Sequence, residues 1–192
     1  MPGLMDEMMG ALNGADGGLG GLLGGVLGGQ ADPKSEKAAS LGMEAILGGL
    51  AKNAQDPKGA ESLLSALDKH DGSALDNLGP GFGGADQAAD GDKILGHVFG
   101  NDRDAVTQNL AAKSGLDVGS IAKMLPALAP VVMGMLGKKK AGGGLDAGGL
   151  AGLLKGEADG FDLGDILGMV TGGGGAGGAA GILGKLRSLF GR

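Results

Sequence analysis

The side chains best suited to chemistry in this sequence are His97, Asp102 and Asp104, which lie close together along the chain. An imidazole beside carboxylates can act as a general base or supply half of a metal site. One histidine with two aspartates and no second histidine is a weak set for either role. We therefore expect His97 to be a helix-end residue, and we interpret His70 and Asp71 as another helix terminus.

Other catalytic signatures are missing from these 192 residues. Without cysteine the chain has no thiol nucleophile, disulfide or thiolate metal ligand. Neither a GxxxxGK[ST] motif nor a GxGxxG motif after a strand pattern occurs, and the net charge of −6 disfavours nucleic acid. The sequence therefore predicts a protein that is not an enzyme. It predicts no catalytic, metal-binding or cofactor-binding residue, no nucleic-acid partner and no small-molecule substrate.

The elements around His97 follow a helical pattern. Helices are expected over residues 92–99, 102–114 and 118–137, and the last has an apolar stripe at spacings of three and four: Ile121, Leu125, Leu128, Val132, Met135 and Leu136. Pro126 and Pro130 fall inside that stripe, and each removes a backbone donor at a cost of about 3 kcal/mol. We expect the helix to break or kink there rather than to run straight.

Helix signals also precede this region. Asp32 followed by Pro33 is a typical helix start and predicts a helix over 34–53, and Pro57 starts another that ends near His70. Residues 72–91 contain turn-forming glycine and proline and are interpreted as a linker.

Glycine is abundant, with 46 residues of the 192, and it is concentrated near both ends. We expect a short amphipathic segment and glycine-rich linker over 1–31, a helical domain over 32–140 and a glycine-rich arm over 141–192. The predicted fold class is all-α, a compact bundle of about five helices with flexible glycine-rich arms at the N- and C-termini.

The end of the chain has the clearest amphipathic pattern. Its apolar face is formed by Ile182, Leu183, Leu186, Leu189 and Phe190, and its basic face by Lys185, Arg187 and Arg192. Such a helix docks on the chain's own core, on a partner protein or on an anionic membrane surface. Lys138, Lys139 and Lys140 are interpreted as the cationic end of a helix rather than as a phosphate or lipid patch.

Three segments of the chain resemble a known family. They are ILGHVFGND and AVTQNLAAKSGLDVGSIAKMLPALAPVVMGMLG, together with ILGGLAKNAQDPKGAESLLSALDKHDGSALDNL upstream. These segments resemble the bacterial domain-of-unknown-function family numbered 937, which includes YidB-like proteins. The resemblance covers roughly residues 36–140. It implies an all-helical bacterial fold and no established reaction.

These observations predict a non-enzymatic helical interaction or self-assembly module with a tethered C-terminal docking helix, whose partner is another protein or a second copy. The alternative is a peripheral membrane or envelope-associated protein anchored by residues 180–192. Asp6 and Glu7 stand where a signal peptide carries lysine or arginine, so we expect a location in the bacterial cytoplasm.

Overall fold

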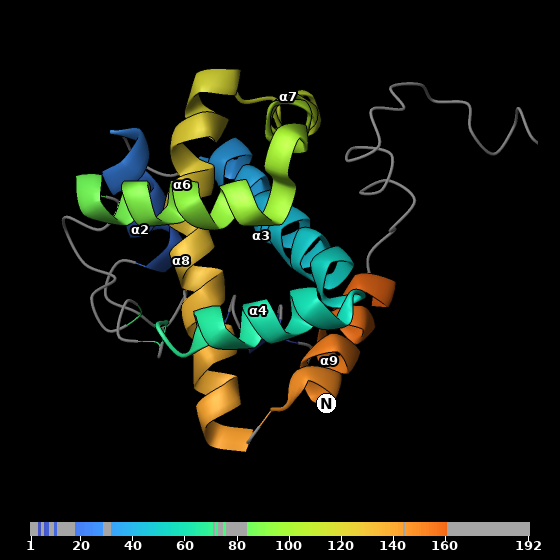
Figure 1. The fold of residues 1–192 in the computed structure, drawn as a ribbon. Coiled ribbons are helices and arrows are strands. Elements are labelled where there is room, and N and C mark those ends of the chain that lie inside the picture. Colours follow the sequence, from blue (N-terminus) through green and yellow to red (C-terminus); the bar gives the residue numbers. More distant parts are fainter. Residues whose placement is uncertain are drawn as a thin grey trace, which may run out of the picture.

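The computed structural model describes most of the chain up to Gly160. The described residues are 18–28, 32–70, 84–143 and 145–160, together with Leu4, Asp6, Glu7, Gly10, Gly72 and Leu75. Their main elements in chain order are α2 (Gly18–Leu27), α3 (Pro33–Ala54), α4 (Pro57–Leu67), α6 (Ala85–Phe99), the 3-10 turn η1 (Gly100–Asp102), α7 (Arg103–Ser114), α8 (Val118–Gly143) and α9 (Ala147–Gly160). No strand occurs among these residues, and the predicted all-α fold is confirmed (Figure 1).

Local sequence signals explain several helix boundaries. The Asp32 side chain accepts a hydrogen bond from the Ser35 backbone N–H at 2.7 Å, while the Ser35 hydroxyl accepts one from the Asp32 N–H. This reciprocal pair starts α3, with Pro33 at the first helical position. Gly115, with φ at 79°, ends α7 in the left-handed conformation that favours glycine.

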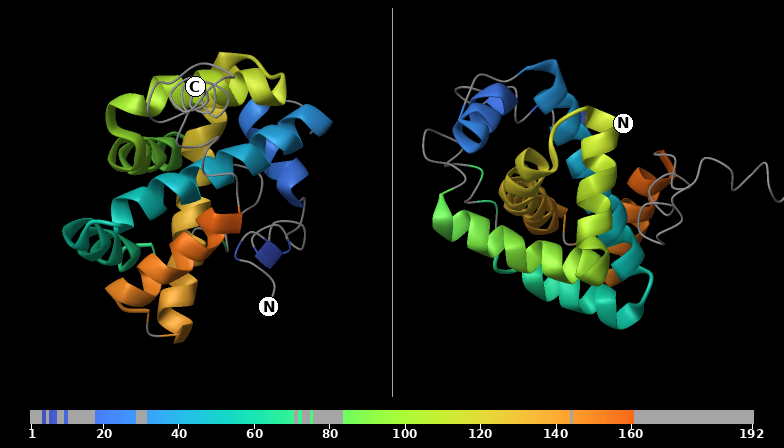
Figure 2. Two further views of the ribbon diagram at one scale, coloured as in Figure 1. Left: turned by 90° about the vertical axis from the view of Figure 1, so that its right-hand side faces the viewer. Right: turned by 90° about the horizontal axis from the view of Figure 1, so that it is seen from above.

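The long helix α8 is the centre of the molecule. Its residues between Ile121 and Gly137 are almost all buried, and the other helices are arranged around it (Figures 1 and 2). By length and composition α8 would suffice to cross a membrane, but 72% of its most apolar window is buried by the rest of the fold. Its apolar character is therefore explained by its place in the core.

Of the break or kink expected at the two prolines, the break does not occur. α8 is one continuous helix that includes Pro126 and Pro130. Because Pro130 has no N–H, the Pro126 carbonyl lacks its usual partner four residues on. That carbonyl faces the backbone of Gly91 in α6, where a β-carbon would lie only 1.8 Å from the oxygen. Dense packing around both buried prolines holds the helix together despite the lost hydrogen bonds.

Helix α6 begins earlier than expected. It starts at Ala85, so the last part of the predicted linker over 72–91 is helical. The turn-forming glycine and proline of residues 72–91 had predicted a linker up to that point, and Gly91 itself weakens helix propensity. In the folded chain Gly91 is the position at which α6 crosses α8 backbone to backbone, and tertiary packing outweighs its propensity.

Two stretches expected to be flexible arms are helices packed on the core, which corrects that part of the prediction. α2 contacts α8 and α3 and buries Leu23, and α9 lies against α3 and α4 and buries Leu150 and Leu154. Both helices contain many glycines. Burial of their leucines supplies stabilisation that propensity alone does not.

The lysines at the end of α8 contact other parts of the chain. The Lys140 ammonium donates to the Leu64 carbonyl at 3.0 Å and pairs with Asp68, both in the last turn of α4 or directly after it. Lys139 pairs with Glu7 at 2.7 Å. Lys140 lies near the C-terminal end of its helix as expected, and it also binds the C-terminal end of α4.

Candidate functional site

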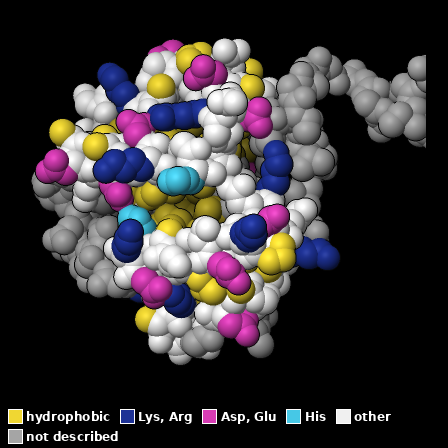
Figure 3. All heavy atoms as spheres, viewed as in Figure 1, with side chains coloured by type: hydrophobic (Ala, Val, Ile, Leu, Met, Phe, Trp, Pro, Cys, Tyr) yellow, Lys and Arg dark blue, Asp and Glu magenta, His cyan; other side chains and the backbone are white. Residues whose placement is uncertain are grey.

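An open cavity of about 570 Å³ lies between α4 and α6. In the space-filling view it is a hollow with an apolar floor near the centre of the face (Figure 3). We call it the α4–α6 groove. Its lining residues are Leu50, Lys52, Asn53, Asp56, Gly59, Ser62, Leu63, Ala66, His70, Asp90, Lys93, Ile94, His97, Val98 and Met133.

The groove arises from the way its two walls are supported. α4 and α6 lie on the same face of the molecule and run across α8, and each packs on both α3 and α8 (Figure 1). Leu50 from α3 and Met133 from α8 contribute to the floor between them. The gap between the two walls is therefore framed by four helices.

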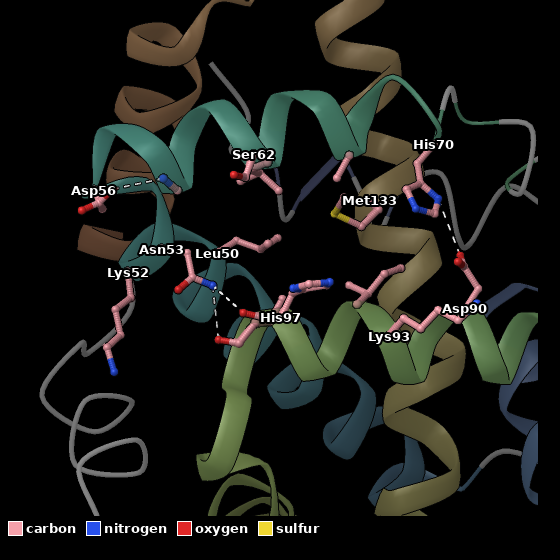
Figure 4. Close-up of a pocket in the computed structure, with 15 residues that line it drawn as sticks. Leu50, Lys52, Asn53, Asp56, Ser62, His70, Asp90, Lys93, His97 and Met133 are labelled. Atoms are coloured by element: carbon pink, nitrogen blue, oxygen red, sulfur yellow. Dashed lines mark hydrogen bonds and ion pairs between the residues drawn. The ribbon is translucent and has the colours of Figure 1, made fainter.

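Two contacts fix the α6 wall. The side-chain amide of Asn53 donates to the backbone carbonyls of His97 at 3.0 Å and Val98 at 3.4 Å, which are free acceptors at the end of α6 (Figure 4). A β-carbon on Gly49 would lie 2.4 Å from the Val98 side chain, so α3 and α6 approach closely there. These contacts fix the α6 wall against α3.

Apolar side chains form the inner surface of the groove. Leu63 is buried on α4 and Ala66 is half-buried beside it, while Ile94 and Val98 are buried on α6. Ile94 and Val98 are four residues apart and therefore share one face of their helix. Apolar side chains of a ligand can pack on this inner surface without burying unpaired polar atoms of the wall.

Polar groups form the rim, and the two carboxylates among them already have partners. Asp56 accepts hydrogen bonds from the backbone N–H groups of Lys58 at 2.8 Å and Gly59 at 3.2 Å, which caps α4. Asp90 lies 3.8 Å from Nδ1 of His70 (Figure 4). Neither carboxylate is a wholly free acceptor.

The two basic side chains on the α6 wall differ from these carboxylates in their contacts. Lys93 and His97 are exposed and are four residues apart on one face of α6. Among the described residues neither side chain forms a hydrogen bond or an ion pair. Figure 4 shows the His97 imidazole directed into the space between α4 and α6.

The groove does not contain the set of His97, Asp102 and Asp104 that the sequence offered as a weak candidate. His97 lies in the last turn of α6, as expected of a helix-end histidine, but neither aspartate is among the lining residues. The chain's two histidines, His70 and His97, instead line one groove. Sequence reasoning missed this because it depends on the positions of two separate helices, and no local signal reports it.

The candidate docking residues near the C-terminus lie outside the described residues. They are Ile182, Leu183, Lys185, Leu186, Arg187, Leu189 and Phe190. Among the described residues, no cluster of three or more histidine, aspartate or glutamate side chains is placed to hold a metal ion.

By its fold and its groove, this protein is a small helical domain with an apolar groove on one face. The chain belongs to the DUF937 family, because the model of that family, described as a bacterial protein of unknown function, matches residues 25–139. No curated protein and no solved structure matched the chain.

Proposed function

We propose that this protein is a non-enzymatic helical interaction module that binds an amphipathic helix of a protein partner in the α4–α6 groove. The observation that carries the proposal is the gap between two helices that lie side by side on one face, with buried apolar residues beneath it. A third helix laid in this gap would cover the exposed part of the floor. Helix-in-groove recognition uses this geometry.

The dimensions of the groove suit such a ligand. α4 has 11 residues, which corresponds to about 16 Å of wall at 1.5 Å per residue. Apolar anchors at positions i, i+4 and i+7 of a bound helix span about 10 Å and fit within that length. The groove volume of about 570 Å³ is within the range of ligand sites.

Close contacts between the helices also position the α6 wall of the groove before any ligand binds. Gly91 brings α6 against the backbone of α8, and Gly49 brings it against α3. Asn53 then binds the last carbonyls of α6. Because the walls are fixed before a ligand arrives, binding requires little ordering of this surface.

A matched pair of variants tests the proposal. Ser62 and Ser65 are both exposed on α4, but only Ser62 lines the groove. We expect Ser62→Trp to fill the groove and Ser65→Trp to leave it open. The probe is a labelled helix-forming peptide of about 15 residues with leucines at i, i+4 and i+7 and glutamine at its polar positions.

Fluorescence anisotropy with the full chain gives the readout. The peptide should bind the wild type and Ser65→Trp with dissociation constants below about 1 mM, and Ser62→Trp should weaken binding at least about tenfold. No binding to the wild type, or equal binding to both variants, would reject the groove as the interaction site. Light scattering on the same variants identifies a second copy as the partner if Ser62→Trp alone reduces the mass.

A further inference from the structure

We infer that the helix bound in the α4–α6 groove is acidic, with carboxylates beside its apolar anchors, and that it belongs to a partner protein rather than to this chain's own C-terminal segment. This inference rests on the proposed function and specifies the chemistry of the partner. It follows from which polar groups at the rim are already engaged.

The carboxylates of the rim have limited capacity for a cationic ligand. One oxygen of Asp56 accepts two backbone hydrogen bonds at the start of α4, and that N-terminal end carries partial positive charge. Asp90 is 3.8 Å from His70 on the opposite wall. A lysine or arginine of a ligand would have to compete with the two backbone donors at Asp56, and at Asp90 it would lie beside the His70 imidazole.

Two donors on the α6 wall, Lys93 and His97, form no such contact with the described residues. Lys93 presents an ammonium group with three donors, and the His97 imidazole donates through at least one nitrogen. Both lie on the α6 wall above the buried Ile94 and Val98. An apolar anchor placed between the walls therefore has unengaged donors one turn apart beside it, which match carboxylates on the flanking positions of a helix.

The chain's own end has the opposite charge. The sequence around Ile182, Leu186 and Leu189 also contains the cations Lys185 and Arg187. In the groove these cations would approach Lys93, and like charges brought together oppose binding. Charge complementarity therefore favours an acidic helix from another protein over residues 180–192.

Three peptides with the same leucine anchors test this inference, and they differ only in having glutamine, glutamate or lysine at the polar positions. We expect the glutamate peptide to bind the full chain about fivefold to tenfold more tightly than the lysine peptide at low salt. The preference should shrink as salt screens the charges. A peptide copy of residues 180–192 should bind no better than the lysine peptide.

Charge-reversal variants assign the preference to the groove. Lys93→Glu should remove or reverse it, whereas Lys123→Glu changes the net charge equally at an exposed site of α8 that does not line the groove and should preserve it. Circular dichroism confirms that both variants fold.

Each remaining outcome has a defined meaning. If all three peptides bind equally, or Lys123→Glu acts like Lys93→Glu, the inference fails while the proposed function stands. If only the glutamine peptide binds, the inference likewise fails and the proposed function stands. If no peptide binds, both fail. If dodecanoate binds and the peptides do not, the groove is a site for a small anionic amphiphile and the inference is overturned. Tighter binding by the 180–192 peptide would make this chain's own end the ligand.

Discussion

Two regions of the molecule bury the surface of α3 in different ways. In one, α9 lies along α3 and brings Leu150 and Leu154 to complete burial (Figure 2). In the other, α3 contributes Leu50 to the floor of the α4–α6 groove, where part of the apolar lining remains open to a ligand. The first region is closed by apolar contact between helices, whereas the second keeps an open cavity with an apolar lining.

The two regions also differ in their relation to the family. All groove-lining residues fall between Leu50 and Met133, within the matched stretch 25–139, whereas α9 begins at Ala147 and lies outside it. The groove therefore lies within the stretch that the family model matches. The α9 cover is contributed by the part of this chain beyond that stretch.

The largest loss of stability is expected at Gly91, which holds the α6 wall of the groove against α8. A β-carbon there would overlap the Pro126 carbonyl. Since the contact is between two backbones, neither side can rotate away. We expect Gly91→Ala to lower the free energy of unfolding by about 3 kcal/mol, measured by urea denaturation followed by circular dichroism.

Gly96 is the matched control for this change. It lies on the same helix, and a β-carbon there would meet nothing within 4 Å. Gly96→Ala should raise the free energy of unfolding by about 0.5–1 kcal/mol because alanine restricts the unfolded chain. Equal effects at the two glycines would contradict the close crossing of α6 and α8.

The α9 region is tested at Leu154. This leucine is fully buried, whereas its neighbour Leu153 is only partly buried. Leu154→Ala should cost about 2–3 kcal/mol in unfolding free energy and Leu153→Ala less than about 1 kcal/mol. Peptide binding at the groove should be unchanged by either substitution. A loss of binding in Leu154→Ala would show that the two regions are coupled.

Substitution of Asp32 tests the cap that starts α3, the helix that both regions share. Hydrogen bonds from the Ser35 backbone N–H and then its hydroxyl lower the pKa of this carboxyl. A lowered folded-state pKa means that the ionised form stabilises the fold above the unfolded pKa, and that this contribution is lost as pH falls through the folded pKa. Asp32→Ala should therefore lower the Tm at pH 7, and the difference from wild type should narrow with acidification below about pH 4.

The smallest effect is expected at Glu44 of α3. Partial burial raises the pKa of this carboxyl, and the Ser40 hydroxyl and Lys113 oppose the shift. The folded state therefore holds the proton more tightly, so stability is greatest below the unfolded pKa and is lost as pH rises through the folded pKa. Glu44→Gln should give a small rise in Tm at pH 7 that disappears below about pH 4, measured by thermal scans across pH.

Much of the helical framework was predictable from the sequence. The starts of α3 and α4 follow from aspartate caps with a proline after each, and the end of α7 follows from Gly115. The family resemblance over roughly 36–140 is confirmed by the match over 25–139. Caps and turns involve residues within a few positions of one another, so a single sequence records them directly.

Other features were not predictable because they depend on distant residues. The pattern placed a linker before residue 92 and a break or kink at the prolines, but α6 starts at Ala85 and α8 continues without a break. The glycines of α2 and α9 indicated flexible arms, yet both stretches are helices with buried leucines. In each case tertiary burial outweighed a local preference of about 1–3 kcal/mol.

The sequence by itself determined that this protein is helical and where α3, α4, α7 and α8 start, because short-range hydrogen bonds and periodicity set those properties. Only the tertiary structure decided that His70 and His97 line one groove and that Asn53 closes the end of α6. Those relations join residues more than 25 positions apart, across helices whose mutual placement depends on the packing of all the others.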